Sequence, residues 1–120
     1  MQITVLKSKL HRATITMADV DYMGSIAIDS DLLEAVGIHP FEQVHVWDIT
    51  NGARFITYAI TECAGSGEIC VNGAAAKLVN KGDLIIIAAF AQMEEAELKV
   101  RKPKIALINP ENKIVKFLQS

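Results

Sequence analysis

The chain has 120 residues, enough for one domain, and its formal net charge is −2 at pH 7. This balance lacks the basic excess that phosphate backbones attract, so nucleic acid is not expected as the main partner. Hydrophobic residues make up 51% of the chain, which excludes a disordered protein. The longest apolar run, residues 84–91, is far shorter than the roughly 20 residues of a membrane-spanning helix. So high an apolar content without a membrane span predicts an oligomer that buries surface between its subunits.

The N-terminal residues are typical of a strand and show no signal-peptide pattern. Without an export signal, Cys63 and Cys70 are expected to be reduced thiols, and the protein is expected in the cytoplasm. Neither cysteine has a second cysteine or a His-x-x-x-His pair at metal-ligand spacing. The histidines, at positions 11, 39 and 45, are dispersed. The sequence therefore predicts no metal site.

Short runs rich in β-branched residues follow one another along the chain, separated by turn signals. Eight of them predict strands, at residues 3–6, 13–16, 26–28, 44–47, 55–60, 84–87, 105–108 and 114–117. Between two of these runs, Asn51-Gly52 predicts a type I′ hairpin turn, which needs positive φ at both central positions. Residues 109–112 predict a second turn, and residues 81–83 introduce the most apolar strand.

Two short helices interrupt this pattern. Residues 30–36 begin with a sequence like a capping box at Ser30 and stop at Gly37, a favourable residue for the end of a helix. Residues 74–78 predict one or two further turns of helix. Many short strands with so little helix favour a compact β-barrel over a sandwich, in one domain that spans residues 1–120.

The common catalytic motifs for phosphate binding, serine hydrolysis and zinc proteolysis are missing from the sequence. Polar residues do stand inside apolar strands. Lys9 and His11 are two apart, so an extended segment puts both on one face. Arg54 and Tyr58 likewise share a face of the strand after the Asn51-Gly52 turn. Each pair considered alone is also consistent with an ordinary solvated strand face.

Two further features are open to two interpretations. Gly24-Ser25 beside an aromatic residue is compatible with an ordinary turn. Trp47 either lines a pocket or belongs to the core.

Five runs, taken together in their order, resemble the family of pyruvoyl-dependent aspartate 1-decarboxylases. They are KLHR from Lys9, AD from Ala18, YMGS from Tyr22, TNGARFITYA from Thr50 and VNGAAA from Val71. Each run is weak alone, but five in the right order in a chain of this length are specific. The resemblance implies a six-stranded double-ψ β-barrel that assembles as a homotetramer, with active sites between neighbouring subunits.

The resemblance also implies the reaction and its cofactor. The family converts L-aspartate to β-alanine and CO₂ for pantothenate and coenzyme A synthesis. Its cofactor is a covalent pyruvoyl group made from the chain's own serine, here Ser25, by autocatalytic cleavage after Gly24. The products would be a chain of residues 1–24 and a chain of residues 25–120. Whether a maturation factor assists the cleavage stays open.

The chemistry of a Gly-Ser step fits this role. A serine hydroxyl is a weak nucleophile, but the fold can press the Ser25 Oγ onto the carbonyl carbon of Gly24. Glycine at position 24 has no Cβ to obstruct that approach. The resemblance assigns Thr57 to the hydrogen bonds that the resulting oxyanion needs, and His11 is a candidate to assist self-processing.

The remaining roles are carried over position by position. The pyruvoyl group at Ser25 forms the Schiff base with the substrate amine, and Tyr58 is the proton donor, because a phenol stays protonated at neutral pH. Arg54 suits a bidentate clamp on one carboxylate of aspartate, and Lys9 is a candidate for the other. The resemblance also places Thr57, Gly73, Ala74 and Ala75 in the substrate-binding segment.

Strand parity raises one difficulty, because it puts Thr57 on the face opposite Arg54 and Tyr58. A bulge, a twisted edge or a site between subunits would each reconcile the three residues. Two other functions are alternatives to the resemblance. One is a non-catalytic oligomeric β-barrel that only binds, and the other is a pyruvoyl enzyme for a different amino acid.

Overall fold

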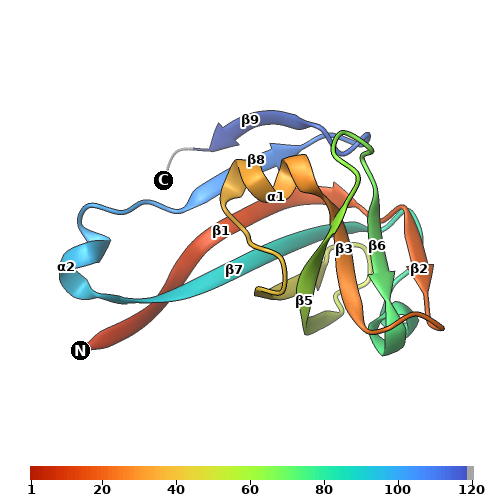
Figure 1. Ribbon diagram of the computed structural model, residues 1–120, viewed down its shortest axis with the longest axis horizontal. Helices are drawn as coiled ribbons and strands as arrows, with labels where there is room; N and C mark the ends of the chain where they lie inside the picture. Colours follow the sequence, from red (N-terminus) through yellow and green to blue (C-terminus); the bar gives the residue numbers. More distant parts are fainter. Residues whose placement is uncertain (119–120) are drawn as a thin grey trace.

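The computed structural model describes residues 1–118, and nine strands form one mixed sheet (Figure 1). The strands are β1 (Gln2–Thr14), β2 (Met17–Asp19), β3 (Ser25–Asp29), β4 (Gln43–Asp48), β5 (Arg54–Glu62), β6 (Ile69–Asn72), β7 (Leu84–Glu94), β8 (Lys104–Ile108) and β9 (Ile114–Leu118). Their order in the sheet is β2-β6-β3-β5-β4-β7-β1-β8-β9. The mainly β fold is confirmed, but the strand number differs from the expected six. Short β2 at one edge and the β8–β9 hairpin at the other extend the sheet.

The longest pairing joins β1 and β7, which run antiparallel from Gln2 opposite Glu94 to Thr14 opposite Leu84. The outer halves of the two strands form an arm that projects from the body of the molecule and ends at α2 (Glu95–Leu98) (Figure 1). Two register shifts interrupt β1, and at the second Arg12 adopts a positive φ of 69°. Such bulges bend a strand, and they let β1, which begins in the arm, follow the curved body.

The core lies on the inner face of the curved sheet. Its members are alternate strand residues, because side chains of a strand point to opposite faces in turn. Leu10, Ile26, Val46 and Ile87 are all fully buried there. Burying each such side chain contributes roughly 1.5–3 kcal/mol to folding. The opposite face of the sheet is called the outer face below.

Helix α1 (Ser30–Val36) confirms the helix expected at residues 30–36 and its end at Gly37, whose φ is 73°. The cap differs from the expectation. The side chain of Asp29, not that of Ser30, accepts a hydrogen bond from the backbone N–H of Asp31, 2.9 Å away. Asp29 also accepts from the N–H groups of Gly65 and Gly67, so one carboxylate ties the helix to the β5–β6 loop.

The turn between β4 and β5 is not the expected type I′ turn. Five residues separate the strands, and Gly52 has a positive φ of 81°, whereas Asn51 does not lie in the left-handed region. The Asp48 carboxylate at the end of β4 explains the wider loop, because it accepts hydrogen bonds from the N–H groups of Thr50 and Asn51.

The helix expected at residues 74–78 is a 3₁₀ helix, η1 (Gly73–Leu78). It follows β6, a four-residue strand that the sequence pattern did not predict because its apolar run is so short. Within the described residues 1–118, none of the helices has the length and apolar character needed to cross a membrane.

Candidate active site

Ser25 is the first residue of β3 and is 2% exposed. It lies opposite Asn72 of β6 in an antiparallel ladder. Its hydroxyl donates a hydrogen bond to the carbonyl oxygen of Met23, 3.1 Å away, and accepts one from Asn72 Nδ2, 3.2 Å away. The hydroxyl is therefore held and turned back toward the residues that precede it. A buried serine in this geometry is not the ordinary turn residue of the alternative interpretation.

Gly73 lies against the backbone of the segment before Ser25. A Cβ at position 73 would lie 2.5 Å from the Cα of Gly24 and 2.7 Å from its nitrogen, and Gly73 has a φ of 77°. Gly24 was expected to need a missing Cβ. Apart from its chain neighbours Met23 and Ser25, a Cβ at position 24 would meet no atom of residues 1–118 within 4 Å, and Gly24 is not in the left-handed region. Contacts with other segments of the fold therefore require glycine at position 73 and not at position 24.

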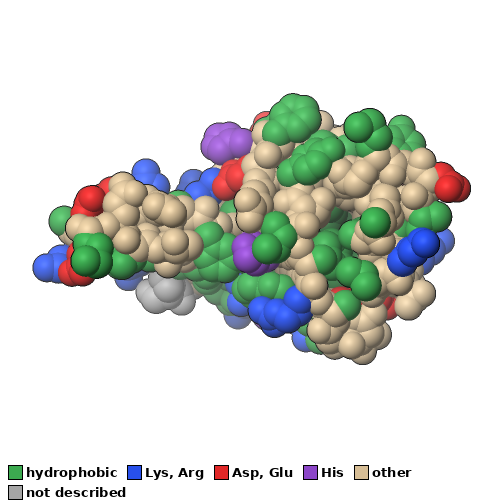
Figure 2. Space-filling view, turned by 90° about the horizontal axis from the view of Figure 1, so that it is seen from below, with side chains coloured by type: hydrophobic (Ala, Val, Ile, Leu, Met, Phe, Trp, Pro, Cys, Tyr) green, Lys and Arg blue, Asp and Glu red, His purple; other side chains and the backbone are tan. Residues whose placement is uncertain are grey.

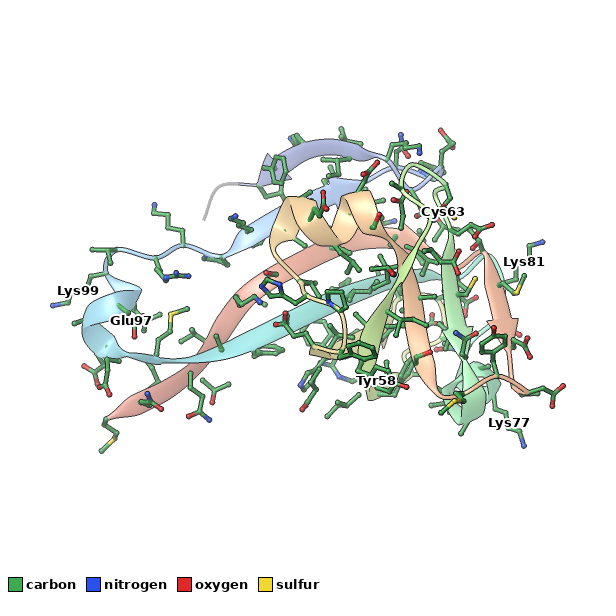
Figure 3. All side chains as sticks on the ribbon, in the orientation of Figure 1. Tyr58, Cys63, Lys77, Lys81, Glu97 and Lys99 are labelled. Atoms are coloured by element: carbon green, nitrogen blue, oxygen red, sulfur yellow. The ribbon has the colours of Figure 1, made fainter. Side chains whose placement is uncertain are left out.

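Tyr58 lies beside Ser25 across the sheet. Strand β5 runs parallel to β3 with Ala59 opposite Ile26, so the residues one step earlier, Tyr58 and Ser25, are neighbours where this ladder begins. Tyr58 stands in the middle of β5, and Figure 3 shows it toward the loop that leads into β4. The Tyr58 ring is half-buried and stacks against Phe41, with 6.3 Å between ring centres.

Thr57 points away from Tyr58. The β4–β5 ladder runs without interruption from Gln43 opposite Tyr58 to Trp47 opposite Arg54, so the alternation of faces is regular there. Thr57 consequently shares the inner face with Phe55, which packs against the core. A bulge in this part of β5 is therefore not what reconciles the expected roles of the three residues.

The basic side chains expected at the site, Lys9, His11 and Arg54, all lie on the outer face. His11 of β1 lies opposite Ile86 of β7, Ile86 lies opposite Trp47, and Trp47 lies opposite Arg54. Because directly opposed residues share a face, His11 and Arg54 belong to one row across four strands. Lys9 stands on the same face, two residues before His11, as expected.

Trp47 and Arg54 are in direct contact within this row. The guanidinium carbon of Arg54 lies 4.6 Å from the centre of a Trp47 ring. Trp47 is half-buried on the outer face and is not a core residue, which excludes the second interpretation from the sequence. The stack restricts the guanidinium to one side of the ring and leaves its hydrogen-bonding edge free for an anion.

His11 is in an unusual electrostatic setting. Burial lowers the pKa of its imidazole, and the charges of Lys9 and Arg12 lower it further. Its Nδ1 atom is buried and has no hydrogen-bond partner among residues 1–118. A neutral imidazole with a free nitrogen can accept or relay a proton near pH 7.

Within one chain the residues of the candidate site fall into two groups. The serine group comprises Ser25, Tyr58, Asn72 and Gly73, followed by Ala74 and Ala75 on η1. The cation group comprises Lys9, His11, Trp47 and Arg54. Arg54 and Tyr58 are four residues apart in one strand, or about 13 Å. Strands β3 and β1 are four places apart in the sheet, or about 19 Å along it. The backbone positions of the two groups therefore lie on separate parts of the outer face.

The outer face carries exposed apolar side chains around these groups. Ile56, between Arg54 and Tyr58 on β5, is 58% exposed, and Phe41 is 76% exposed. Figure 2 shows apolar side chains spread over the broad half of one face, with a histidine and basic side chains near its centre. A pocket of about 440 Å³ also opens near His45 and Phe90. Its lining, over the described part of the chain, contains none of the expected site residues.

Sequence reasoning missed two residues of the site. Asn72 stands in the VNGAAA run, but nothing in that run marks it as a hydrogen-bond partner of Ser25. Phe41 gave no signal at all, because its contact with Tyr58 depends on how a loop folds against β5. Over residues 1–118, the structure holds no group of three or more His, Cys, Asp or Glu side chains placed to bind a metal ion.

Comparisons with known proteins show the family of this chain. The aspartate decarboxylase family profile matches residues 1–115. The aspartate 1-decarboxylase of Xanthomonas oryzae pv. oryzae (strain MAFF 311018) is 58% identical over 114 residues, which are 95% of this chain and 90% of the relative. The protein of that name from Stenotrophomonas maltophilia (strain K279a) is 56% identical over the same shares. The one from Xylella fastidiosa (strain Temecula1) is 55% identical over 93% of this chain and 89% of its own. A match of this extent, on a chain with this buried serine, places the protein in the aspartate decarboxylase family.

Proposed function

We propose that this protein decarboxylates L-aspartate to β-alanine and CO₂ for pantothenate synthesis, with a pyruvoyl group that it makes from Ser25. The family membership supports the reaction. The buried Ser25 hydroxyl, held by Met23 and Asn72 next to the Gly24 peptide, is the single observation that carries the cofactor assignment.

Self-cleavage uses only atoms of this chain and one water. Ser25 Oγ adds to the carbonyl carbon of Gly24, and the bond from that carbon to the Ser25 nitrogen breaks, which leaves an ester and a free amine. Loss of the Ser25 α-proton then breaks the Cβ–Oγ bond, so the Gly24 carboxylate leaves and position 25 becomes dehydroalanine. Hydrolysis releases ammonia and leaves the pyruvoyl group. The fold favours the first step because Met23 and Asn72 hold the buried Ser25 hydroxyl beside the residue that it attacks.

The residues around Ser25 are compatible with a pyruvoyl group at this position. The position is 2% exposed, so water is largely kept from it, and Asn72 supplies a side-chain N–H donor within hydrogen-bond distance of the Ser25 Oγ. A pyruvoyl group supplies the electron sink that decarboxylation of an amino acid needs. Thr57 stays a candidate for self-processing and substrate binding, and it would act from the inner side of β5.

The chain's own groups bind the substrate and supply the proton. Arg54 offers a bidentate site for one carboxylate of aspartate, and Lys9 offers an ammonium for the other. The N–H groups of Gly73, Ala74 and Ala75 lie in the segment next to Ser25, where the small side chains allow close approach. Tyr58, beside Ser25, donates the proton to the carbon that loses CO₂. His11, neutral near pH 7, assists self-processing.

We propose that the active site forms between subunits of a homotetramer. The serine group and the cation group of one chain start from backbone positions about 13 Å apart or more, and two copies facing each other can bring unlike groups together. The exposed Ile56 on the outer face supports such an interface, because burying it in the oligomer removes it from water.

We also propose that the protein is located in the cytoplasm. Cys63 and Cys70 are both free thiols, which supports a reducing cytoplasm. Cleavage of the purified chain alone would show that no maturation factor is required.

The test is the intact mass of the denatured protein. We expect two species, residues 1–24 and residues 25–120, the larger lighter by one ammonia than hydrolysis alone would give. Ser25→Ala should give one uncut, folded and inactive chain. Ser66→Ala is the matched control, because Ser66 also follows a glycine but is exposed, and it should cleave normally.

A full-length Ser25→Ala chain that still decarboxylates aspartate would overturn the assignment. A wild-type chain that stays uncut after prolonged warm incubation would favour a barrel that only binds. Comparison of aspartate with glutamate addresses the substrate, since one extra methylene is typically rejected by about 1–3 kcal/mol.

A further inference from the structure

The ring of Phe41 is the nearest aromatic neighbour of Tyr58. Phe41 belongs to the loop between α1 and β4, and its ring stacks on that of Tyr58 at an interplanar angle of 29° with centres 6.3 Å apart. Phe41 is nevertheless 76% exposed. An apolar ring left in water on one side and stacked on a phenol on the other contributes little to the core. Its placement suggests a role toward Tyr58.

The backbone of the loop fixes this placement. Phe41 has a positive φ of 69°, a left-handed conformation that is unfavourable for a residue with a Cβ. The Phe41 N–H donates to the carbonyl oxygen of Ala59 at 2.7 Å, and the Ala59 N–H donates to the carbonyl oxygen of Glu42 at 3.0 Å. This pair of hydrogen bonds attaches the loop to β5 at the residue directly after Tyr58.

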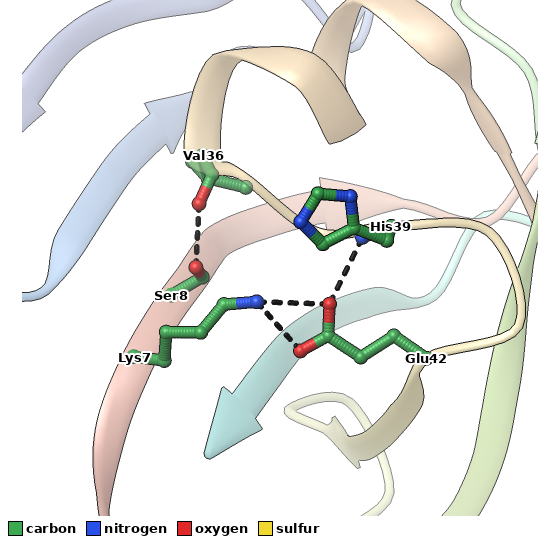
Figure 4. Close-up of polar contacts among 5 residues, drawn as sticks. All are labelled: Lys7, Ser8, Val36, His39 and Glu42. Atoms are coloured by element: carbon green, nitrogen blue, oxygen red, sulfur yellow. Dashed lines mark hydrogen bonds and ion pairs between the residues drawn. The ribbon is translucent and has the colours of Figure 1, made fainter. Parts of the chain in front are cut away.

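The side chain of Glu42 anchors the loop to β1 (Figure 4). Its carboxylate lies 2.7 Å from Lys7 Nζ and accepts a hydrogen bond from the His39 N–H at 2.9 Å. Both side chains of the ion pair are only about one-fifth exposed, so solvent screens it less than a pair on the open surface. Lys7 stands at the bulge of β1. The loop that carries Phe41 is thus held from two sides.

We propose that Phe41, on the loop anchored by the Lys7–Glu42 ion pair, is a positioning residue that orients the Tyr58 phenol for proton donation. The proposal rests on the proposed function, in which Tyr58 is the donor. A phenol on a strand face can turn about its side-chain bonds, and a stacked ring excludes part of those orientations. Correct placement of a proton donor contributes to the rate of the step that uses it, and much less to substrate binding.

The first test measures the contact itself and needs no activity. The chain has two tyrosines, so incorporation of 3-fluorotyrosine should give two ¹⁹F resonances, and Tyr58→Phe assigns them. Phe41→Ala should shift or broaden the Tyr58 resonance and leave that of Tyr22 in place. Phe117→Ala, which removes another half-exposed phenylalanine on distant β9, should change neither. An unmoved Tyr58 resonance in Phe41→Ala would overturn the proposal.

The second test separates positioning from folding and assembly. An aromatic pair is worth about 0.5–1.5 kcal/mol, so kcat of Phe41→Ala should fall roughly two- to tenfold. The KM for aspartate, the extent of cleavage by mass and the oligomer size should stay unchanged. Phe41→Trp, which keeps a stacking ring, should restore kcat. Lys7→Gln, which breaks the ion pair, should lower kcat in the same direction by less.

The outcomes distinguish the proposed function from the positioning role of Phe41. An uncut, inactive wild-type chain would refute the proposed function, whatever the ¹⁹F spectra show. A cut, active wild type with an unchanged kcat in Phe41→Ala would refute the positioning role alone. If Phe41→Ala instead changed the oligomer size, the ring would be an interface residue, and the positioning role would likewise be refuted.

Discussion

Gly73 and Gly24 are in backbone contact across the turn that precedes Ser25. A side chain at position 73 would place its Cβ 2.5 Å from Gly24 Cα, which is closer than van der Waals contact allows. The left-handed φ of Gly73 adds a second reason for glycine there. The two glycines lie on separate elements, β6–η1 and the β2–β3 connection, and their contact fixes where the expected cleavage site sits against the sheet.

Gly73→Ala should therefore slow cleavage of the bond between Gly24 and Ser25, because the preceding turn must shift to admit the methyl group. The free energy of unfolding should fall by more than the roughly 1–2 kcal/mol that the left-handed φ alone costs. Intact mass against time and urea denaturation measure the two effects. Gly37→Ala is the matched control, with a φ of 73° and open space around the added Cβ within the described residues. It should lose stability but cleave at the normal rate, and equal cleavage in both variants would contradict the steric argument.

A buried carboxyl pair makes the stability of the fold depend on pH. Burial, together with a hydrogen bond and the charge of Asp83, raises the pKa of Asp48 to about 6. In the unfolded chain an aspartate titrates near about 4, so the folded state binds the proton more tightly. This contribution to stability is present below about pH 4 and is lost as pH rises through about 6. The native protein should therefore lose stability across this window.

Asp48→Asn should raise the melting temperature at pH 7 and flatten its dependence between about pH 4 and 7. The amide is neutral at every pH, keeps an oxygen for the Thr50 and Asn51 N–H groups, and can donate to Asp83. The expected gain at pH 7 is on the order of 1–3 kcal/mol. Asp21→Asn, at an exposed position, should change little. A variant as pH-dependent as the wild type would exclude Asp48 as the source.

The stack of Arg54 on Trp47 should matter for substrate binding. Trp47→Leu removes the ring that holds the guanidinium, so the KM for aspartate should rise about two- to fivefold, as expected for a cation–π contact at a half-exposed site. Arg54→Lys should raise KM more, because an ammonium does not bind a carboxylate through two parallel hydrogen bonds. Steady-state kinetics at fixed extent of cleavage measures both. A Trp47→Leu enzyme with the wild-type KM would show that Arg54 is placed without the ring.

Mixed oligomers test whether the site lies between subunits. Arg54→Ala chains keep the serine group and Ser25→Ala chains keep the cation group, and each alone should be inactive or nearly so. Co-expressed in equal amounts, they should regain about a quarter of wild-type activity, since that share of interfaces joins two intact groups. The two pure variants, prepared in parallel, set the baseline. Mixtures no more active than the sum of their parts would place the site within one chain.

The sequence by itself predicted most of the elements and supplied the candidates for the site. Runs rich in β-branched residues marked most strands but not β2 or β6, Gly37 marked the end of α1, and the five ordered runs singled out Ser25, Arg54 and Tyr58 as candidates. Parity also placed Thr57 correctly on the opposite face of β5. These features are local, because they depend on side-chain periodicity and on residue types along a short stretch of chain.

Only the tertiary structure decided which of these residues are in contact with one another. The contact of Gly73 with Gly24, the hydrogen bond from Asn72 to Ser25 and the stack of Phe41 on Tyr58 each join segments whose proximity depends on strand order. That order, with β6 and β5 on either side of β3, is set by pairing between strands that are distant in the sequence. The periodicity of residues along the chain does not reveal it. The separation of the cation group from the serine group has the same origin, because sheet register, and not spacing along the chain, fixes the distances between strands.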